Sequence, residues 1–251
     1  MKKSPKISVI TVVYNNATEL QSTIDSVVEQ TYLDVEFIII DGGSTDGTLN
    51  IIEKNNNFID CWISEPDKGI YDAMNKGTQI SSGDYIIFIN SGDKFFHKEV
   101  LANVINLSGC KNDVIYGDHW TLKSYKNDGH YKAKNLRKLK YGMICSHQSM
   151  LFKLKLLMER GYSYNYGTAA DYELLCYLYS KGASFFKLDD VIISYYQAGG
   201  VSDKKRIKSL CNSYKAYRDN LRSTFDIKFF YLWRLTMETG KLIFRWVKVK
   251  C

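Results

Sequence analysis

The N-terminal part of this 251-residue chain alternates continuous β-branched runs with stretches of helical periodicity. The runs Ile7–Val13, Glu36–Ile40 and Asp84–Ile89 lack regular polar alternation, as expected for strands that are buried on both faces of a sheet. Helical stripes lie between them, one beginning near Leu20 and another over Ile70–Ile80. This order predicts an α/β fold in which helices flank a Rossmann-like, mostly parallel sheet.

Other segments have local patterns of their own. Thr18 and Gln21 have the spacing of a capping box at the start of the first helix. The polar, basic stretch Lys123–Lys140 predicts a loop, Asp171–Lys181 a helix and Val191–Tyr196 a strand. The α/β pattern therefore continues to about residue 202.

Polar residues follow each of the three buried runs directly. They are Tyr14-Asn15-Asn16, the segment Asp41–Asp46 and the segment Asn90–Asp93. In open α/β sheets, ligands bind outside the carboxyl ends of the strands. The three clusters therefore predict one binding site at that edge of the sheet.

Three aspartates are candidates for chemistry, and each has an ordinary structural alternative. Asp41 could bind a base or ribose, or only cap the turn before the next helix. Asp93 could hold a cation that bridges phosphates, or be a plain loop residue. Asp171 could act as a general base, or only stabilise the start of its helix. Spacing alone leaves these alternatives open.

The net charge of +7 is concentrated at the C-terminus. Residues 203–251 carry 13 lysines and arginines against 4 acidic residues, so we divide the chain into an α/β domain at 1–202 and a basic amphipathic helical region at 203–251. Large apolar residues alternate with basic ones over 226–251, which is typical of a helix at a membrane surface. Packing of helices on the α/β domain, or a homodimer, explains the pattern equally well. Nucleic-acid binding is not expected, because the basic residues form no continuous stripe.

Several classes of protein lack their defining motifs here. The chain has no P-loop, no G-x-S-x-G and no G-x-G-x-x-G after a strand, which counts against P-loop ATPases, α/β-hydrolases and dinucleotide-binding dehydrogenases. It shows no signal peptide and no apolar run of membrane-spanning length. We therefore expect a cytoplasmic location.

Taken together, four segments resemble the family 2 glycosyltransferases of the GT-A fold, in particular bacterial members that build surface polysaccharides of the colanic acid, capsule or O-antigen type. The segments are Ile7–Asn15, Phe37–Thr48, Ser64–Gly77 and Phe88–Asp93. The resemblance covers roughly residues 6–202 and is most specific in the first hundred. It implies a nucleotide-sugar donor.

The resemblance also implies roles for individual residues. It places the nucleotide against Thr11, Tyr14, Asn15, Asp41, Lys68, Gly69, Asn75, Lys76 and Asn90. It makes Asp93 the ligand of a divalent metal, Mn²⁺ or Mg²⁺, and Asp171 the general base. It puts His147 and Gln148 on the acceptor side, and Gly200 and Ser202 near the diphosphate. Two departures stand out: Asn90–Asp93 has a single carboxylate where relatives often have several, and Ala170 replaces an acidic neighbour of the base.

The implied reaction is an inverting transfer of a sugar, with UDP the expected nucleotide, to a hydroxyl of a glycan or lipid-linked acceptor at the inner face of the plasma membrane. Two rival functions stay open. A nucleotidyltransferase would normally have a Gly-rich phosphate loop with basic residues where this chain has Tyr14-Asn15-Asn16. A non-catalytic nucleotide-sugar-binding module is compatible with the reduced Asn90–Asp93 motif, although the presence of Asp171 argues against it.

Overall fold

The computed structural model describes residues 4–122, 129–197 and 206–250. The chain divides into two compact units. Unit 1 comprises residues 1–134, 145–162 and 183–198, and unit 2 comprises residues 135–144, 163–182 and 199–251. The domain boundary expected at residue 202 stays a prediction, since compactness is a different criterion from shared ancestry.

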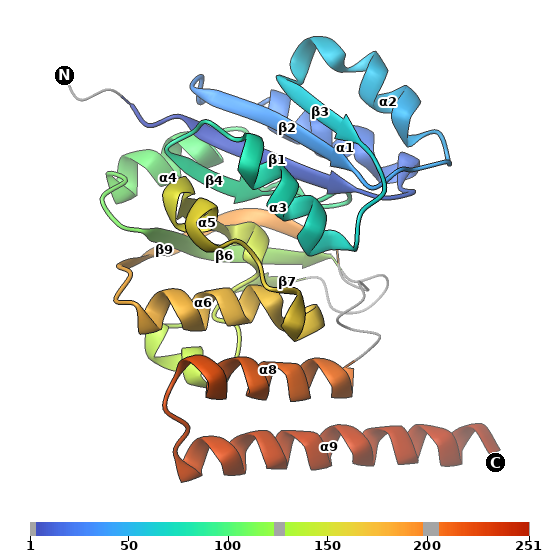
Figure 1. Cartoon of the computed structure of the whole chain (residues 1–251), viewed down its shortest axis with the longest axis vertical. Coiled ribbons are helices and arrows are strands. Elements are labelled where there is room, and N and C mark those ends of the chain that lie inside the picture. Colours follow the sequence, from blue (N-terminus) through green and yellow to red (C-terminus); the bar gives the residue numbers. More distant parts are fainter. Residues whose placement is uncertain (1–3, 123–128, 198–205, 251) are drawn as a thin grey trace. The chain divides into compact units, whose positions relative to one another are not determined.

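Unit 1 is built on a sheet of nine strands among the described residues, in the order β3-β2-β1-β4-β8-β6-β9-β5, with β7 paired to β6 (Figure 1). The strands are β1 (Ile7–Val13), β2 (Val35–Asp41), β3 (Cys61–Ser64), β4 (Tyr85–Phe88), β5 (Lys94–Phe95), β6 (Val114–Leu122), β7 (Gly129–Tyr131), β8 (Met150–Lys153) and β9 (Phe185–Gln197). Strands β1 to β4 are parallel to one another, whereas β8 is antiparallel to both β4 and β6. Strands β1, β2, β4 and β6 therefore end at the same edge.

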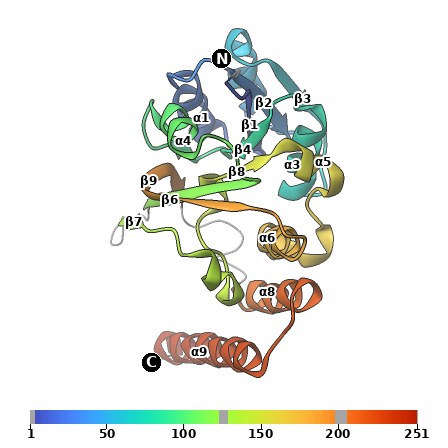
Figure 2. The same cartoon turned by 90° about the vertical axis from the view of Figure 1, so that its left-hand side faces the viewer.

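Five helices cover the two faces of this sheet. They are α1 (Ala17–Val28), α2 (Thr48–Lys54), α3 (Ile70–Ile80), α4 (Val100–Ser108) and α5 (Leu154–Arg160), and single turns η1 (Asn56–Phe58) and η3 (His147–Ser149) lie between elements. Figure 2 shows α1 and α4 on one side of the strands, and α3 and α5 on the other. On the first side, Val9 belongs to a buried cluster with Leu20 and Val104. The predicted α/β architecture is confirmed.

Close packing on the second face explains a glycine in α3. A Cβ atom on Gly77 would lie 2.8 Å from Cγ2 of Ile10 and 3.2 Å from Cγ1 of Ile40, so only a glycine lets the helix approach the sheet this closely. The continuous isoleucine and valine runs form these strands because both faces of the sheet are covered.

Unit 2 is helical. It contains η2 (Leu136–Tyr141), η4 (Tyr164–Ala169), α6 (Ala170–Ser180), α8 (Arg206–Asn220) and α9 (Phe225–Lys250), the last two drawn in red tones in Figure 1. The Tyr172 hydroxyl donates to the carbonyl of Leu139 at 2.6 Å, and the Tyr231 hydroxyl donates to the Tyr172 hydroxyl at 3.2 Å. Within the described part of the chain, no helix is long and apolar enough to cross a membrane.

The structure corrects some local predictions. The capping box at Thr18 and Gln21 is wrong: α1 begins at Ala17, whose N–H donates to Asp46 at 3.0 Å. The loop predicted over Lys123–Lys140 is wrong in part, because β7 and η2 lie within it. The strand predicted at Val191–Tyr196 is confirmed but is longer, beginning at Phe185. The helical pattern after residue 202 is confirmed by α8 and α9.

Candidate functional site

Asp41 ends β2 and is fully buried. It lies at the edge of the sheet where the parallel strands have their carboxyl ends, which we call the ligand edge because open α/β sheets bind their ligands there. Its Oδ2 accepts the N–H of Gly43 at 3.1 Å, the N–H of Ser44 at 2.9 Å and the hydroxyl of Ser64 at 2.6 Å. The Ser44 hydroxyl donates to the other oxygen, Oδ1. The carboxylate thus organises the loop from within, and Gly43, with φ +82°, supplies the left-handed turn that this needs.

The loops after β1 and β2 are tied to each other by side chains. Asn15, in the left-handed conformation at φ 47°, donates its N–H to the Ser44 hydroxyl at 2.7 Å and accepts the N–H of Thr45 at 2.8 Å. Asp46 accepts the N–H of Ala17 at 3.0 Å and that of Thr48 at 3.1 Å, which caps the starts of α1 and α2 together. These contacts hold the loop that carries the exposed Tyr14 at this edge.

The loop after β4 joins the same edge. Ser91 donates its N–H to the carbonyl of Val12 at 3.1 Å, and the Asn16 amide donates to the Ser91 hydroxyl at 3.0 Å. Thr11 is buried inside β1 and donates its hydroxyl to the carbonyl of Ile89 at 2.7 Å. Asn90 is buried, and no described residue donates to its Oδ1. The three predicted polar clusters therefore do converge.

Asp93 ends this loop, and protein groups enclose its side chain. It is only 4% exposed, its Oδ2 accepts the Gln148 side-chain amide at 2.6 Å, and its Oδ1 accepts the Gln197 N–H at 2.9 Å. Burial raises the pKa of Asp93 to about 7, in spite of these two donors. The residue links the ends of β4, η3 and β9.

These contacts bear on the metal role that the resemblance gives to Asp93. Mn²⁺ and Mg²⁺ bind carboxylate oxygens that can reach the cation. Both oxygens of Asp93 already accept N–H groups, and among the described residues no three His, Cys, Asp or Glu side chains gather as a metal site. In this arrangement Asp93 does not fit a direct metal ligand, so we assign no mechanistic step to a metal.

The segment Lys68–Lys76 forms the turn into α3 and its first two turns. Gly69, at φ +113°, precedes the helix and donates its N–H to Asp67 at 2.7 Å. Lys76 pairs with Glu65 at 2.7 Å, and this hydrogen bond raises the pKa of the lysine, which stays cationic. The Asn75 amide bonds both backbone groups of Tyr162, at 2.7 and 3.0 Å. Lys68 is exposed.

His147 and Gln148 form η3, next to the start of β8 at this edge. Gln148 bonds Asp93, as described above. Burial lowers the pKa of His147 to about 4, so its imidazole is neutral at pH 7, and no described residue bonds its buried Nε2.

Sequence patterns missed a further pair at this edge, in the second half of β6. Asp118 is 1% exposed and contacts Nε2 of His130 on β7 at 2.6 Å, while its Oδ1 accepts the N–H of Ala133 at 2.7 Å. Only the pairing of β6 with β7 brings the two side chains together, and the loop prediction for 123–140 concealed it.

Asp171 belongs to unit 2 and lies in the first turn of α6. Its Oδ1 accepts the N–H of Tyr172 at 2.7 Å, while Ala169 occupies the N-cap position and makes no side-chain cap. Its role as a base stays a prediction. Gly200 and Ser202 lie outside the described residues.

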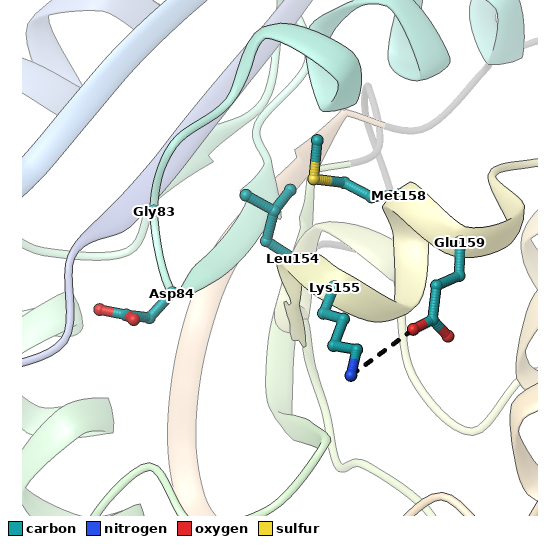
Figure 3. Close-up of a pocket in the computed structure, with 6 residues that line it drawn as sticks. All are labelled: Gly83, Asp84, Leu154, Lys155, Met158 and Glu159. Atoms are coloured by element: carbon teal, nitrogen blue, oxygen red, sulfur yellow. Dashed lines mark ion pairs between the residues drawn. The ribbon is translucent and has the colours of Figure 1, made fainter.

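A hollow of about 450 Å³ lies at the opposite edge of the sheet. Figure 3 shows its lining, with Asp84 just before β4 and Lys155 paired with Glu159 on α5 at 3.8 Å. Both members of this pair are mostly exposed, and the hollow has no convergent buried polar groups. It is therefore not the candidate site.

Three polar loops converge at the carboxyl ends of parallel strands, where open α/β sheets bind their ligands. Comparisons with known proteins then identify the family of the chain. The profile of "Glycosyl transferase family 2" matches residues 8–162, so the chain belongs to that family. It is a nucleotide-sugar-dependent glycosyltransferase, which confirms the resemblance and the enzyme class expected from the sequence.

Curated relatives cover most of the chain. It is 30% identical over 218 residues to a "PGL/p-HBAD biosynthesis glycosyltransferase" of Mycobacterium tuberculosis, covering 82% of this chain and 84% of that protein. It is 27% identical over 205 residues to the Escherichia coli "UDP-Glc:alpha-D-GlcNAc-diphosphoundecaprenol beta-1,3-glucosyltransferase WfaP", covering 79% and 80%.

Solved structures share the fold at low sequence identity. Staphylococcus aureus TarS 1-349 in complex with UDP superposes with a TM-score of 0.67 at 19% identity, and the match covers 84% of this chain but only 65% of that one. The mannosyltransferase PcManGT from Pyrobaculum calidifontis, in complex with GDP-Man and Mn²⁺, gives a TM-score of 0.68 at 18% identity, covering 89% and 66%.

Proposed function

We propose that this glycosyltransferase takes its sugar from a UDP-sugar and transfers it, with inversion, to a hydroxyl of a glycan or lipid-linked acceptor in bacterial surface-polysaccharide biosynthesis. The observation that carries the proposal is the convergence of three polar loops at the ends of β1, β2 and β4 in a family 2 chain. Two names add support: that of WfaP specifies UDP-Glc and a diphosphoundecaprenol-linked acceptor, and TarS was crystallised with UDP.

In the proposed reaction the acceptor hydroxyl attacks the anomeric carbon of the donor sugar from the side opposite the diphosphate. Asp171 takes the hydroxyl proton as the new C–O bond forms, because an alcohol is a poor nucleophile until it is partly deprotonated. The bond from the anomeric carbon to the diphosphate breaks, and the nucleoside diphosphate leaves with the electron pair. In-line attack inverts the anomeric configuration. Lys68 and Lys76, both predicted at the nucleotide, would offset the charge of the leaving group.

A transfer assay with UDP-, GDP- and dTDP-sugars tests this reaction, with the anomeric configuration of the product read by NMR. Asp171→Asn is expected to lower turnover by at least about 100-fold while leaving UDP affinity unchanged. Asp219→Asn, an acidic residue on α8 of the same unit, is the matched control. Unchanged turnover in Asp171→Asn would remove this residue from the mechanism. Release of a sugar 1-phosphate, with transfer of the nucleoside monophosphate group, would instead indicate a nucleotidyltransferase, and sugar-nucleotide binding without any product would indicate a non-catalytic module.

A metal requirement, with Mn²⁺ or Mg²⁺ as the cofactor, stays part of the prediction from the resemblance. PcManGT was solved with Mn²⁺, whereas the enclosed Asp93 of this chain argues against a direct ligand there. Calorimetry of UDP binding with Mn²⁺, with Mg²⁺ and with a chelator decides the matter. Equal affinity under all three conditions would show that nucleotide binding needs no metal.

We also propose that α9 attaches the protein to the cytoplasmic face of the membrane, where a lipid-linked acceptor lies. Ile227 and Tyr231 face inward, whereas another side of the helix exposes its apolar residues to solvent. These exposed residues are Phe225, Phe229, Leu232, Trp233 and Met237. With the basic excess of residues 203–251, they match a helix whose apolar face enters the lipid while its cations meet anionic headgroups.

Vesicles containing phosphatidylglycerol test this attachment. The double variant Phe229→Ser, Trp233→Ser is expected to lose flotation with the vesicles, and deletion of residues 226–251 should do the same. Leu33→Ser, at a site 94% exposed in unit 1, is the control for simple loss of an exposed apolar group. Wild-type protein that fails to float would overturn the attachment to the membrane. A dimer that dissociates on the same substitutions would show that this face of α9 contacts a second copy of the chain.

A further inference from the structure

Unit 2 contains a hollow of about 400 Å³ for which no sequence motif accounts. Its walls are η2 and the first half of α9, and both elements belong to the same unit. The side chains that line it are those of Lys138, Tyr141, Asp226, Phe229, Phe230 and Trp233. The four from α9 are three and four residues apart, so they lie on one side of that helix. The hollow is thus an aromatic groove that also holds charged groups.

Local geometry fixes the wall that η2 provides. The side chain of Leu139 is buried, and its carbonyl accepts the hydroxyl of Tyr172, which ties the turn to α6. Lys138 and Tyr141 are three residues apart, and such pairs eclipse each other in a 3₁₀ helix. The ammonium group of Lys138 therefore lies over the ring of Tyr141, 5.7 Å from its centre. The turn presents a cation and an aromatic ring together.

Further cations gather around two rings that contact each other. The rings of Tyr141 and Phe230 meet edge to face, with their centres 4.8 Å apart. Nζ of Lys140 lies 4.9 Å from the centre of the Tyr141 ring, and the guanidinium carbon of Arg234 lies 5.8 Å from that of Phe230. With Lys138, three cations surround this pair of rings. Contacts with aromatic faces hold such cations in place without neutralising them.

Carboxylates neutralise little of this charge. Asp226 is the carboxylate in the lining, and its Oδ2 lies 3.5 Å from Nζ of Lys140, with both side chains about half exposed. Within the described ranges of the chain, neither Lys138 nor Arg234 forms an ion pair with a carboxylate. Three cations against one carboxylate leave the hollow with a net charge of +2.

The charge and the rings together indicate the kind of partner. A second copy of the chain that docked by the same face would set one positive hollow against another, which costs electrostatic free energy. An anion avoids this cost. Phe229 and Trp233 are 62% and 52% exposed, so the hollow opens beside an apolar surface that suits hydrocarbon. An acidic phospholipid combines an anion with hydrocarbon chains.

We propose that this hollow binds the phosphate group of an anionic membrane phospholipid, with Lys138 and Arg234 as the cations that contact it. This proposal rests on the proposed attachment of α9 to the membrane and deepens it, because a phosphate site needs η2 as well as α9. Lysine and arginine side chains donate charge-assisted hydrogen bonds to phosphate oxygens. The exposed rings of Phe229 and Trp233 then contact the acyl chains below the phosphate.

Short-chain phospholipids, used as monomers in solution, test the hollow without a bilayer. In calorimetry, dihexanoylphosphatidylglycerol is expected to bind the wild type, and dihexanoylphosphatidylcholine to bind at least about 10-fold more weakly, because lysine and arginine repel its choline cation. Glycerol phosphate carries the charge without the chains and should also bind at least about 10-fold more weakly. Equal binding of the phosphatidylcholine overturns recognition by charge. Equal binding of glycerol phosphate overturns a lipid as the occupant.

Single substitutions locate the site. Lys138→Gln is expected to weaken the binding of dihexanoylphosphatidylglycerol by about 10-fold, and Arg234→Gln by a similar factor. Lys181→Gln is the matched control, because this exposed lysine of the same unit also lies over a ring, 5.6 Å from the centre of Tyr177. We expect it to change the affinity by less than about twofold. Equal losses in Lys138→Gln and Lys181→Gln would indicate diffuse attraction and overturn the site, as would no loss in either.

Flotation with phosphatidylglycerol vesicles separates this site from the attachment itself. Lys138→Gln should float less than wild type, and Lys181→Gln should float as wild type does. A wild type that floats but binds no short-chain lipid overturns the phosphate site and leaves the attachment of α9 intact. A wild type that binds the short-chain lipid but does not float overturns the attachment instead. Sedimentation that shows a dimer, dissociated by Lys138→Gln, would make a second copy the occupant and overturn the lipid.

Discussion

Replacing Asp41 by alanine tests whether this residue acts from inside the loop. The change removes the acceptor for the N–H groups of Gly43 and Ser44, and for the hydroxyls of Ser44 and Ser64. The hydroxyls can turn toward other partners, but the two backbone N–H groups are fixed. A buried donor without a partner costs about 1–3 kcal/mol, so the two together lower the free energy of unfolding by about 2–6 kcal/mol. This is a large share of the stability of an ordinary domain.

Urea unfolding followed by circular dichroism measures this loss. Asp41→Asn keeps one acceptor oxygen and is expected to lose less, and Ser64→Ala, which removes one hydroxyl donor, less still. If Asp41 served only the ligand, its alanine variant would unfold within about 0.5 kcal/mol of wild type while nucleotide binding disappeared. That outcome would refute the reasoning from the buried hydrogen bonds.

Three other changes test the framework of unit 1. Burial alone would raise the pKa of Glu36, but hydrogen bonds led by that from Ser8 lower it to about 2, from 4.5. Because the pKa is lower in the folded state, this interaction stabilises the fold by at most about 3 kcal/mol above pH 4.5, and the stabilisation is lost as the pH falls toward 2. Urea midpoints of Glu36→Gln that show the same acid dependence as wild type would contradict this account. Gly83→Ala would bring a Cβ within 2.7 Å of the backbone nitrogen of Ser8, so we expect a loss of about 1–3 kcal/mol, and a midpoint equal to that of wild type would show that the chain yields there. Asn75→Ala removes both bonds to the Tyr162 backbone, and thermal unfolding should show a loss of about 1–3 kcal/mol; an unchanged midpoint would mean that water replaces the amide.

The sequence was sufficient for the sheet and its ligand edge because the signals there are local. The run Ile7–Val13 is too apolar for a surface strand, and the polar clusters follow the strands without a gap. The start of α1 could not be predicted in the same way, since the carboxylate that accepts its first N–H comes from Asp46, on the other side of β2. Strand β7 was missed because only its pairing with β6 defines it.

The candidate site shows the same difference between local features, which the sequence predicts, and non-local contacts, which it does not. The sequence predicted that Asp41 and Asp93 lie at the strand ends, and both do, but nothing in the pattern says which way a carboxylate faces. The structure turns both into interior positions, each with two occupied oxygens.

The discontinuity of unit 1 has a consequence for synthesis on the ribosome. Strand β9 is the last strand of the sheet to be made, and it pairs with both β6 and β5. Until residues 185–197 leave the exit tunnel, β6 of the nascent chain has an open edge, and β5 has no strand to join. Unit 1 therefore cannot complete its sheet as the first part of the chain emerges. Truncation of translation before β9 would release a product with an unpaired strand, which is a substrate for chaperones or for aggregation.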